Sequence, residues 1–161
     1  PLVKDISPEY LDIALKSSYM VLMNRDEAEW ISGENCIEAA ARKVMEKTDA
    51  IVIAKDGGNG CFAVKKGCEG KWYPGFKVVL TDTMGCGDSF WGAIMYAVVQ
   101  GFDLDTSIIF ANAAGAVKAT KIGTGAQVPT FAEMVDLIEN NGYTVPQINK
   151  EREAFVELSL Q

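Results

Sequence analysis

Short apolar runs recur along the chain and give the first indication of its fold. Residues 19–23, 50–54 and 76–80 are apolar almost throughout. Such runs are typical of strands that are buried on both faces of a sheet. Two further stretches, 61–66 and 71–74, lie on either side of a turn that contains Gly67 and Gly70. This arrangement predicts an antiparallel pair of strands beside the buried ones.

Helical patterns occupy most of the intervals between and after these runs. Apolar residues recur at helical spacing in two stretches, namely Ile37, Ala40, Ala41 and Val44 in the first and Phe90, Ile94 and Val98 in the second. Residues that suit helix N-caps introduce other helices: Ser7 before Pro8, Asn24, Asp103 before a helix at 104–121, and Thr130, which forms a capping box with Glu133.

The order of these elements indicates the fold class. A strand, a helix and a second strand, in that order over residues 19–54, imply a parallel βαβ unit. We therefore predict an α/β protein with a mostly parallel, doubly wound sheet, in a single domain that spans residues 1–161. The pattern of the tail at 144–161 is less regular.

Composition and charge narrow the range of partners. The chain of 161 residues has 15 basic and 22 acidic side chains, which give a formal net charge of −7. An acidic chain without a basic cluster argues against nucleic acid or an anionic membrane as its main partner. No apolar run approaches the roughly 18 residues of a membrane-spanning helix.

The residue types that are missing restrict the chemistry. The chain has no histidine, so Ser-His-Asp and Cys-His catalysis are excluded. Its four cysteines, Cys36, Cys61, Cys68 and Cys86, show no C-x-x-C spacing, which makes a zinc site improbable and favours free thiols in a reducing cytosol. We expect a cytoplasmic protein in which acidic residues, Lys, Tyr or Cys transfer protons.

One stretch combines a strand, a glycine-bracketed turn and a helix. The run at 76–80 leads into Gly85-Cys86-Gly87, after which Asp88 opens a helical pattern. Free backbone N–H groups at the positive end of a helix suit a phosphate or a developing anion. Alternatively, Asp88 serves only as a capping residue. A helix N-terminus also lowers the pKa of a thiol, so Cys86 is expected to be the most reactive of the four.

This stretch resembles a known family signature. The string Asp82-Thr83-x-Gly-x-Gly-Asp-x-Phe90 is similar to the C-terminal signature of the ribokinase-like (PfkB) carbohydrate kinases, apart from Cys86, where the family usually has alanine or serine. The resemblance implies a three-layer αβα fold and transfer of the γ-phosphoryl group of ATP to a sugar hydroxyl. It also implies that Asp88 is the catalytic base.

The same resemblance assigns roles around the signature. The N–H groups of Gly85, Cys86 and Gly87 would form an anion hole. Asp82, together with the loop that contains Gly123, would bind a monovalent cation such as K⁺.

Three other segments match the family, and each also has a simpler interpretation. Asn24 and Glu27 look like the family motif that holds Mg²⁺ through water, and they also fit a capping box. A turn with Gly57, Gly58 and Gly60 resembles the family's nucleotide loop, and it also fits a hairpin turn. The helix that carries Asn112, Gly115 and Ala116 would lie beside the adenine, although its small residues also suit plain helix packing.

The resemblance covers only the C-terminal half of a family member. We expect the sugar-binding N-terminal half and its lid to be absent, so that the chain alone binds ATP weakly, phosphorylates no sugar, and associates with itself or with the missing half. Two alternatives stay open: a non-catalytic nucleotide-binding module, and one subunit of a split kinase. The identity of the sugar is not encoded in these residues.

Overall fold

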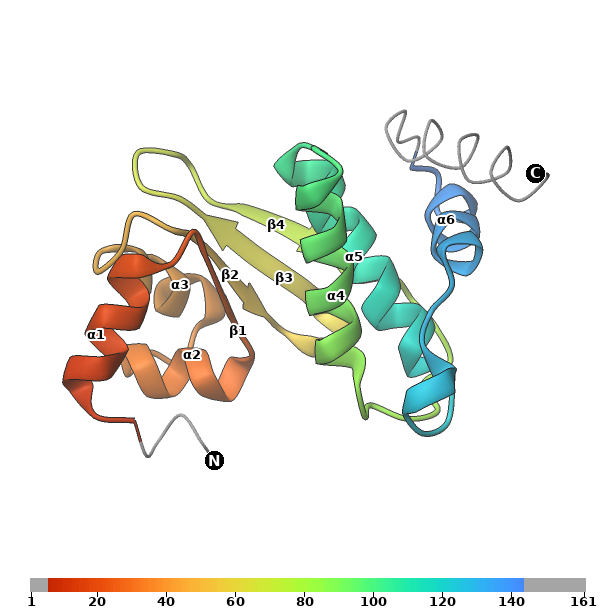
Figure 1. The fold of residues 1–161 in the computed structure, drawn as a ribbon, viewed down its shortest axis with the longest axis horizontal. Coiled ribbons are helices and arrows are strands. Elements are labelled where there is room, and N and C mark those ends of the chain that lie inside the picture. Colours follow the sequence, from red (N-terminus) through yellow and green to blue (C-terminus); the bar gives the residue numbers. More distant parts are fainter. Residues whose placement is uncertain (1–5, 144–161) are drawn as a thin grey trace. The chain divides into compact units, whose positions relative to one another are not determined.

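The computed structural model describes residues 6–143 (Figure 1). The chain divides into two compact units, Pro1–Pro74 and Gly75–Gln161, each with its own secondary structure and packing. Residues 1–5 and the irregular tail expected at 144–161 lie outside the described residues.

The first unit is built on a sheet with the strand order β1-β2-β3-β4. Its elements are α1 (Pro8–Ser17), β1 (Met20–Met23), α2 (Arg25–Ser32), α3 (Ile37–Met45), β2 (Ile51–Lys55), the 3₁₀ turn η2 (Gly57–Asn59), β3 (Gly60–Val64) and β4 (Lys71–Pro74). Strands β1 and β2 run parallel and are connected through α2 and α3, whereas β3 pairs antiparallel with both β2 and β4. The parallel βαβ unit and the antiparallel pair predicted from the sequence are therefore confirmed.

The core of the first unit lies on one face of this sheet. Met23 is opposite Ala54, and Ala54 is opposite Phe62, so these side chains point to the same face. They form one cluster with small apolar residues of the helices, including Ala28, Ala40, Ala41 and Val44. Phe62, which is 1% exposed, is the largest side chain in this cluster. It fills the space that the alanines leave.

The described part of the second unit is helical. It contains α4 (Cys86–Val99), α5 (Leu104–Ala119), the 3₁₀ turn η3 (Gly125–Gln127) and α6 (Phe131–Asn140). Helices α4 and α5 pack along each other (Figure 1). Four aromatic rings whose centroids lie 5.5–6.4 Å apart join the helices: Tyr96, Phe102, Phe110 and Phe131. None of the helices within residues 6–143 is long and apolar enough to cross a bilayer.

The helix N-caps predicted from the sequence are confirmed. Ser7 and Asp103 each accept a hydrogen bond from the backbone three residues ahead. Asn24 and Thr130 both form complete capping boxes. Local side-chain chemistry therefore fixes where these helices begin.

Two expectations about the sheet are wrong. The sheet is mixed, since only one of its three strand pairs is parallel. Residues 76–80 form no strand, because within the described residues they pair with no other strand. Phe76 is buried against Tyr143, whereas Val79 and Leu80 are 84% and 64% exposed. An apolar run becomes a strand only where a neighbour accepts its hydrogen bonds.

Candidate active site

The segment that precedes α4 is fastened to the far end of α5. The N–H groups of Thr81 and Asp82 both donate to the carbonyl of Ala119, at 2.7 and 3.2 Å. The carboxylate of Asp82 accepts from the N–H of Met84 and from the N–H of Gly123, each at 2.9 Å. These bonds, that of Met84 foremost, hold the pKa of Asp82 below its ordinary value. Asp82 and Gly123, which the sequence assigns to one cation site, are thus in direct contact.

Gly85 makes the turn into α4. It is the N-cap residue, and its φ of 78° lies in the left-handed region that glycine adopts without strain. A Cβ at this position would lie 3.4 Å from Cε of Lys118. The N–H of Cys86 donates to the carbonyl of Thr83 at 3.2 Å. Of the three amides that the sequence assigns to an anion hole, that of Cys86 therefore already has an acceptor.

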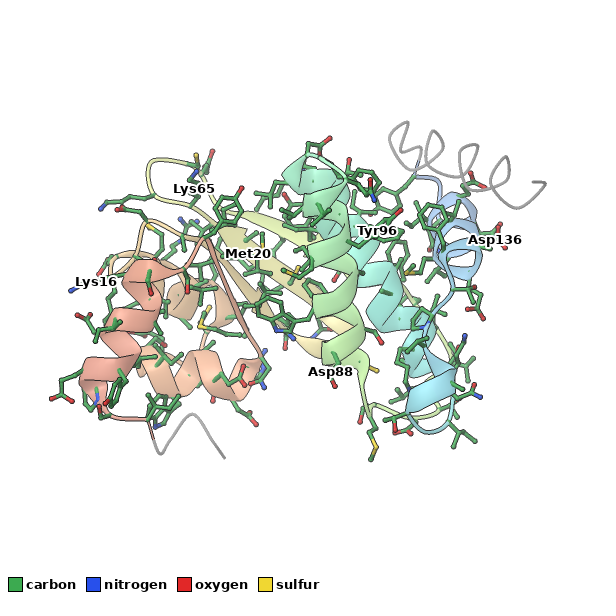
Figure 2. All side chains as sticks on the ribbon, in the orientation of Figure 1. Lys16, Met20, Lys65, Asp88, Tyr96 and Asp136 are labelled. Carbon is green, nitrogen blue, oxygen red and sulfur yellow. The ribbon has the colours of Figure 1, made fainter. Side chains whose placement is uncertain are left out.

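Asp88 is an exposed residue in the first turn of α4, and Figure 2 labels it at that end of the helix. It lines a cavity of about 430 Å³ in the second unit. Gly85 and Ser89 also line this cavity, and so do Thr124 and Gly125 of the loop after α5. The remaining wall is largely apolar and includes Ala93, Tyr96, Phe110, Ala114, Phe131 and Met134. The volume is in the range of small-molecule sites.

Lys118 is a cavity residue that sequence reasoning missed. It is 2% exposed, lines the cavity, and donates from Nζ to the carbonyl of Lys121 at 3.3 Å. Phe110, Ala114 and Lys118 are four residues apart and form one face of α5. A charged residue on that face, in the middle of small apolar residues, is the signal that could have identified it.

The sequence predicted a lowered pKa for the Cys86 thiol, and the structure gives the opposite direction. Burial raises the pKa of the Cys86 thiol, and the charge of Asp82 acts in the same sense. The positive charge of Lys118 opposes this rise without cancelling it. Desolvation is therefore the largest cause of this rise, and it outweighs the attraction of Lys118.

The adenine-side candidates on α5 lie away from the cavity wall. Asn112 is 9% exposed and Gly115 is partly buried, and the cavity is instead lined on α5 by Phe110, Ala114 and Lys118. A Cβ at Gly115 would lie 3.5 Å from the carbonyl oxygen of Cys86. The small residue at 115 therefore allows α4 and α5 to approach closely. Ala116, its neighbour, is also partly buried.

In the first unit, Asn24 and Glu27 form the predicted capping box. Oδ1 of Asn24 accepts from the N–H of Glu27, and Oε2 of Glu27 accepts from the N–H of Asn24, both at 2.8 Å. Their side chains therefore lie together at the N-terminus of α2. No group of three or more Asp, Glu, Cys or His side chains within residues 6–143 is placed to hold a metal ion.

An ion pair joins this helix end to the glycine turn. Nε and Nη2 of Arg25 donate to Oδ1 of Asp56 at 2.9 and 2.7 Å, and Asn59 donates to Oδ2 at 3.0 Å. Gly57 and Gly58 follow directly, and a Cβ on either would meet no atom within 4 Å. Gly60 closes the turn with a φ of 107°. Asp56 thus fixes the turn. The pair was missed because 31 residues separate its members.

Comparisons with known proteins identify relatives of this chain. Fructokinase-1 from Zea mays is 34% identical over 128 residues, which are 74% of this chain and 39% of the relative. The 5-dehydro-2-deoxygluconokinase of Shouchella clausii is 25% identical over 132 residues, which are 81% of this chain and 40% of the relative.

Solved structures give the same result. Ribokinase from Thermotoga maritima superposes with a TM-score of 0.74 and 32% identity, over 80% of this chain and 44% of that one. A putative ribokinase II from E. coli, in complex with ATP and Mg²⁺, superposes with a TM-score of 0.72 and 25% identity, over 82% of this chain and 42% of that one. The chain thus spans about two fifths of the length of these relatives. Residues 2–131 match the family described as pfkB family carbohydrate kinase. On this match, the chain belongs to the pfkB family of carbohydrate kinases.

Proposed function

We propose that this chain carries the nucleotide site, the anion-binding turn and the catalytic base of an ATP-dependent sugar kinase. The observation that carries the proposal is the place of Asp88, in the first turn of α4 and on the wall of the cavity that Gly85 also lines. A carboxylate beside backbone N–H groups at a helix start combines a proton acceptor with donors for a phosphoryl group. Membership of the pfkB family supports the same reaction class.

In the proposed step, the oxygen of a sugar hydroxyl attacks the γ-phosphorus of ATP and the bond from that phosphorus to ADP breaks. The hydroxyl proton moves to a carboxylate oxygen of Asp88, which is worth about a hundred- to ten-thousand-fold in rate. The amides of Gly85 and Gly87 stabilise the negative charge on the phosphoryl group. The amide of Cys86 joins them when its bond to Thr83 opens.

The residues of the first unit fit a site for magnesium and nucleotide phosphates. Glu27 uses one carboxylate oxygen in the capping box, and the other remains for a magnesium-bound water. Mg²⁺, when bound, neutralises charge on the phosphates. Asn24 orients Glu27, and the open space over Gly57 and Gly58 leaves room for the nucleotide beside the turn that Gly60 closes.

Two further roles belong to the proposal. Asp82 retains lone pairs beyond its two backbone hydrogen bonds, so it and the carbonyl of Gly123 suit a monovalent cation such as K⁺. A contact of the adenine or ribose with Asn112, Gly115 and Ala116 rests on the family resemblance alone, because these residues of α5 do not line the cavity.

The test is an ADP-release assay with ATP, Mg²⁺ and a panel of acceptors: fructose, ribose, 5-dehydro-2-deoxygluconate and a nucleoside. It is run on the 161-residue chain and on the polypeptide encoded by the whole gene. Asp88→Asn should lower kcat at least about a hundredfold and leave the Kd of ATP nearly unchanged, because only proton transfer is lost. Asp136→Asn, which changes an exposed carboxylate of α6, is the matched control. Full turnover in Asp88→Asn would remove Asp88 from the reaction.

The chain spans only about two fifths of the length of its relatives, which favours two alternatives to a complete kinase. A non-catalytic nucleotide module would bind ATP and release no ADP with any acceptor. A subunit of a split kinase would release ADP only after a second polypeptide is added. The same assay, run beside a measurement of ATP affinity, separates these two cases from a complete kinase.

A further inference from the structure

Among the described residues, Lys118 carries the most deeply buried charged group, and the proposed function gives this group no role. The side chain is 2% exposed. Burying an ammonium is costly unless it is compensated by hydrogen bonds or an opposite charge. An ammonium has three N–H donors. Within residues 6–143 its one recorded acceptor is the carbonyl of Lys121, at 3.3 Å. The structure therefore keeps a strong donor only partly satisfied on the wall of a cavity.

The surroundings show that this charge acts on the site. Lys118 lowers the pKa of Asp82 and opposes the rise in the pKa of Cys86. Its Cε lies 3.4 Å from the Cβ position of Gly85, the residue that starts α4. Lys118, Gly85 and Asp88 thus line one cavity. The apolar rest of the wall keeps the local dielectric low, which strengthens any attraction between a ligand charge and Lys118.

We propose that Lys118 is the side-chain cation of this site and that it binds the phosphate group of a ligand that enters the cavity. The inference rests on the proposed function and deepens it, because that function assigns no side-chain cation of this chain to the phosphoryl group. A fixed ammonium adds a full charge to those partial charges. The ligand class is a phosphate ester. It is either the nucleotide or the phosphorylated sugar, and the two share the group that Lys118 recognises.

The experiment measures binding of inorganic phosphate, ADP and fructose 1-phosphate to the 161-residue chain by titration calorimetry. Lys118→Met should weaken binding of every phosphate ligand that the wild type binds by at least about tenfold. Lys118→Arg, which keeps the charge, should retain most of the affinity. Lys66→Met is the control, since it makes the same change in net charge at an exposed lysine of the first unit. Loss with ADP alone identifies the nucleotide as the ligand, and loss with the sugar phosphate alone identifies the product.

A second readout needs no ligand and tests whether Lys118→Met leaves the site folded. Without the positive charge, the pKa of Cys86 should rise, so its alkylation by iodoacetamide should slow while that of Cys36 is unchanged. Equal affinity of the wild type and Lys118→Met for all three phosphates overturns the inference and leaves the kinase proposal standing. So does the absence of any phosphate binding to the wild type. If binding depends on Lys118 while the polypeptide encoded by the whole gene transfers no phosphoryl group to any acceptor, the inference is supported and the proposed function is removed.

Discussion

The two units use their charged residues in opposite ways. In the first unit, Asp56 is held by Arg25 and Asn59, and Glu27 is held by the backbone of Asn24. In the second unit, Asp88 and Lys118 line a cavity, and the capping role that the sequence offered for Asp88 belongs to Gly85. Candidate site residues of the first unit therefore also hold the backbone. In the second unit Asp82 does the same, whereas Asp88 and Lys118 line the cavity.

The two units also differ in how tightly their apolar side chains are packed. Phe62 fills the core of the first unit, among alanines and valines that are themselves buried. Three of the four clustered aromatic rings of the second unit, Tyr96, Phe110 and Phe131, border a cavity. The first unit therefore has a filled core, whereas the second contains a cavity of a size that suits a small molecule.

The largest difference is expected from the same truncation in each unit. Phe62→Ala should lower the free energy of unfolding by about 3–5 kcal/mol, because it opens a void in a filled core. Phe131→Ala should cost clearly less, since this half-buried ring already borders a cavity. Denaturant unfolding measures both. Equal losses would mean that the second unit is as tightly packed as the first.

A smaller difference is expected between the two capping boxes, which share the same pair of reciprocal bonds, although Glu133 also pairs with Lys121. Glutamine can replace glutamate in such a box, so Glu27→Gln and Glu133→Gln should both keep their helices. Only Glu27→Gln should weaken the binding of ATP in the presence of Mg²⁺, by about ten- to hundredfold, as for groups that orient a metal. Calorimetry with and without Mg²⁺ measures this. If the two variants bind ATP equally well, Glu27 is a capping residue and nothing more.

The rates at which the thiols are alkylated are expected to differ several-fold between the two units. Cys36 and Cys68 are exposed residues of the first unit, whereas burial raises the pKa of Cys86 in the second. Iodoacetamide should therefore modify Cys36 and Cys68 several-fold faster than Cys86 at neutral pH, because the thiolate is the reactive form. Mass spectrometry of partly alkylated protein gives the order. Modification of Cys86 first would restore the expectation from sequence.

The smallest effect concerns the acid stability of the second unit. The pKa of Asp82 is lower in the folded chain than in the unfolded one, whose value is about 3.9. Its contribution is complete above the unfolded pKa and is lost as the pH falls through the folded pKa. Asp82→Asn should therefore flatten the dependence of the unfolding temperature on pH between about 2 and 4. Parallel curves for the variant and the wild type would contradict the assigned hydrogen bonds.

Local rules in the sequence predicted much of the fold. The caps at Asn24, Asp103 and Thr130 depend on residues three positions apart, and all three form as expected. The strand at 76–80 was wrong because a strand needs a partner, and its own apolar run cannot supply one. The placement of Asp88 at a helix start beside a glycine turn was also accessible from the sequence.

What could not be predicted depends on distance along the chain and on burial. Arg25 meets Asp56 across 31 residues, and neither residue signals the other. Lys118 stands out only as a charge on an otherwise apolar face of α5, and its burial beside the turn at Gly85 depends on the folded structure. For Cys86 two effects of opposite sign compete, and their balance depends on desolvation that the sequence does not reveal.

The tether between Asp82 and Gly123 has a consequence for biosynthesis. Its two residues are 41 positions apart, and α4 and α5 are both synthesised between them. Helices close local bonds quickly, whereas a bond across such a loop must wait for the whole loop to exist. On the ribosome, Asp82 and Asp88 are therefore made before Gly123 emerges. We expect pulse-labelled hydrogen exchange during refolding to protect the interior amides of α5 before the amide of Gly123, so that the site is completed last.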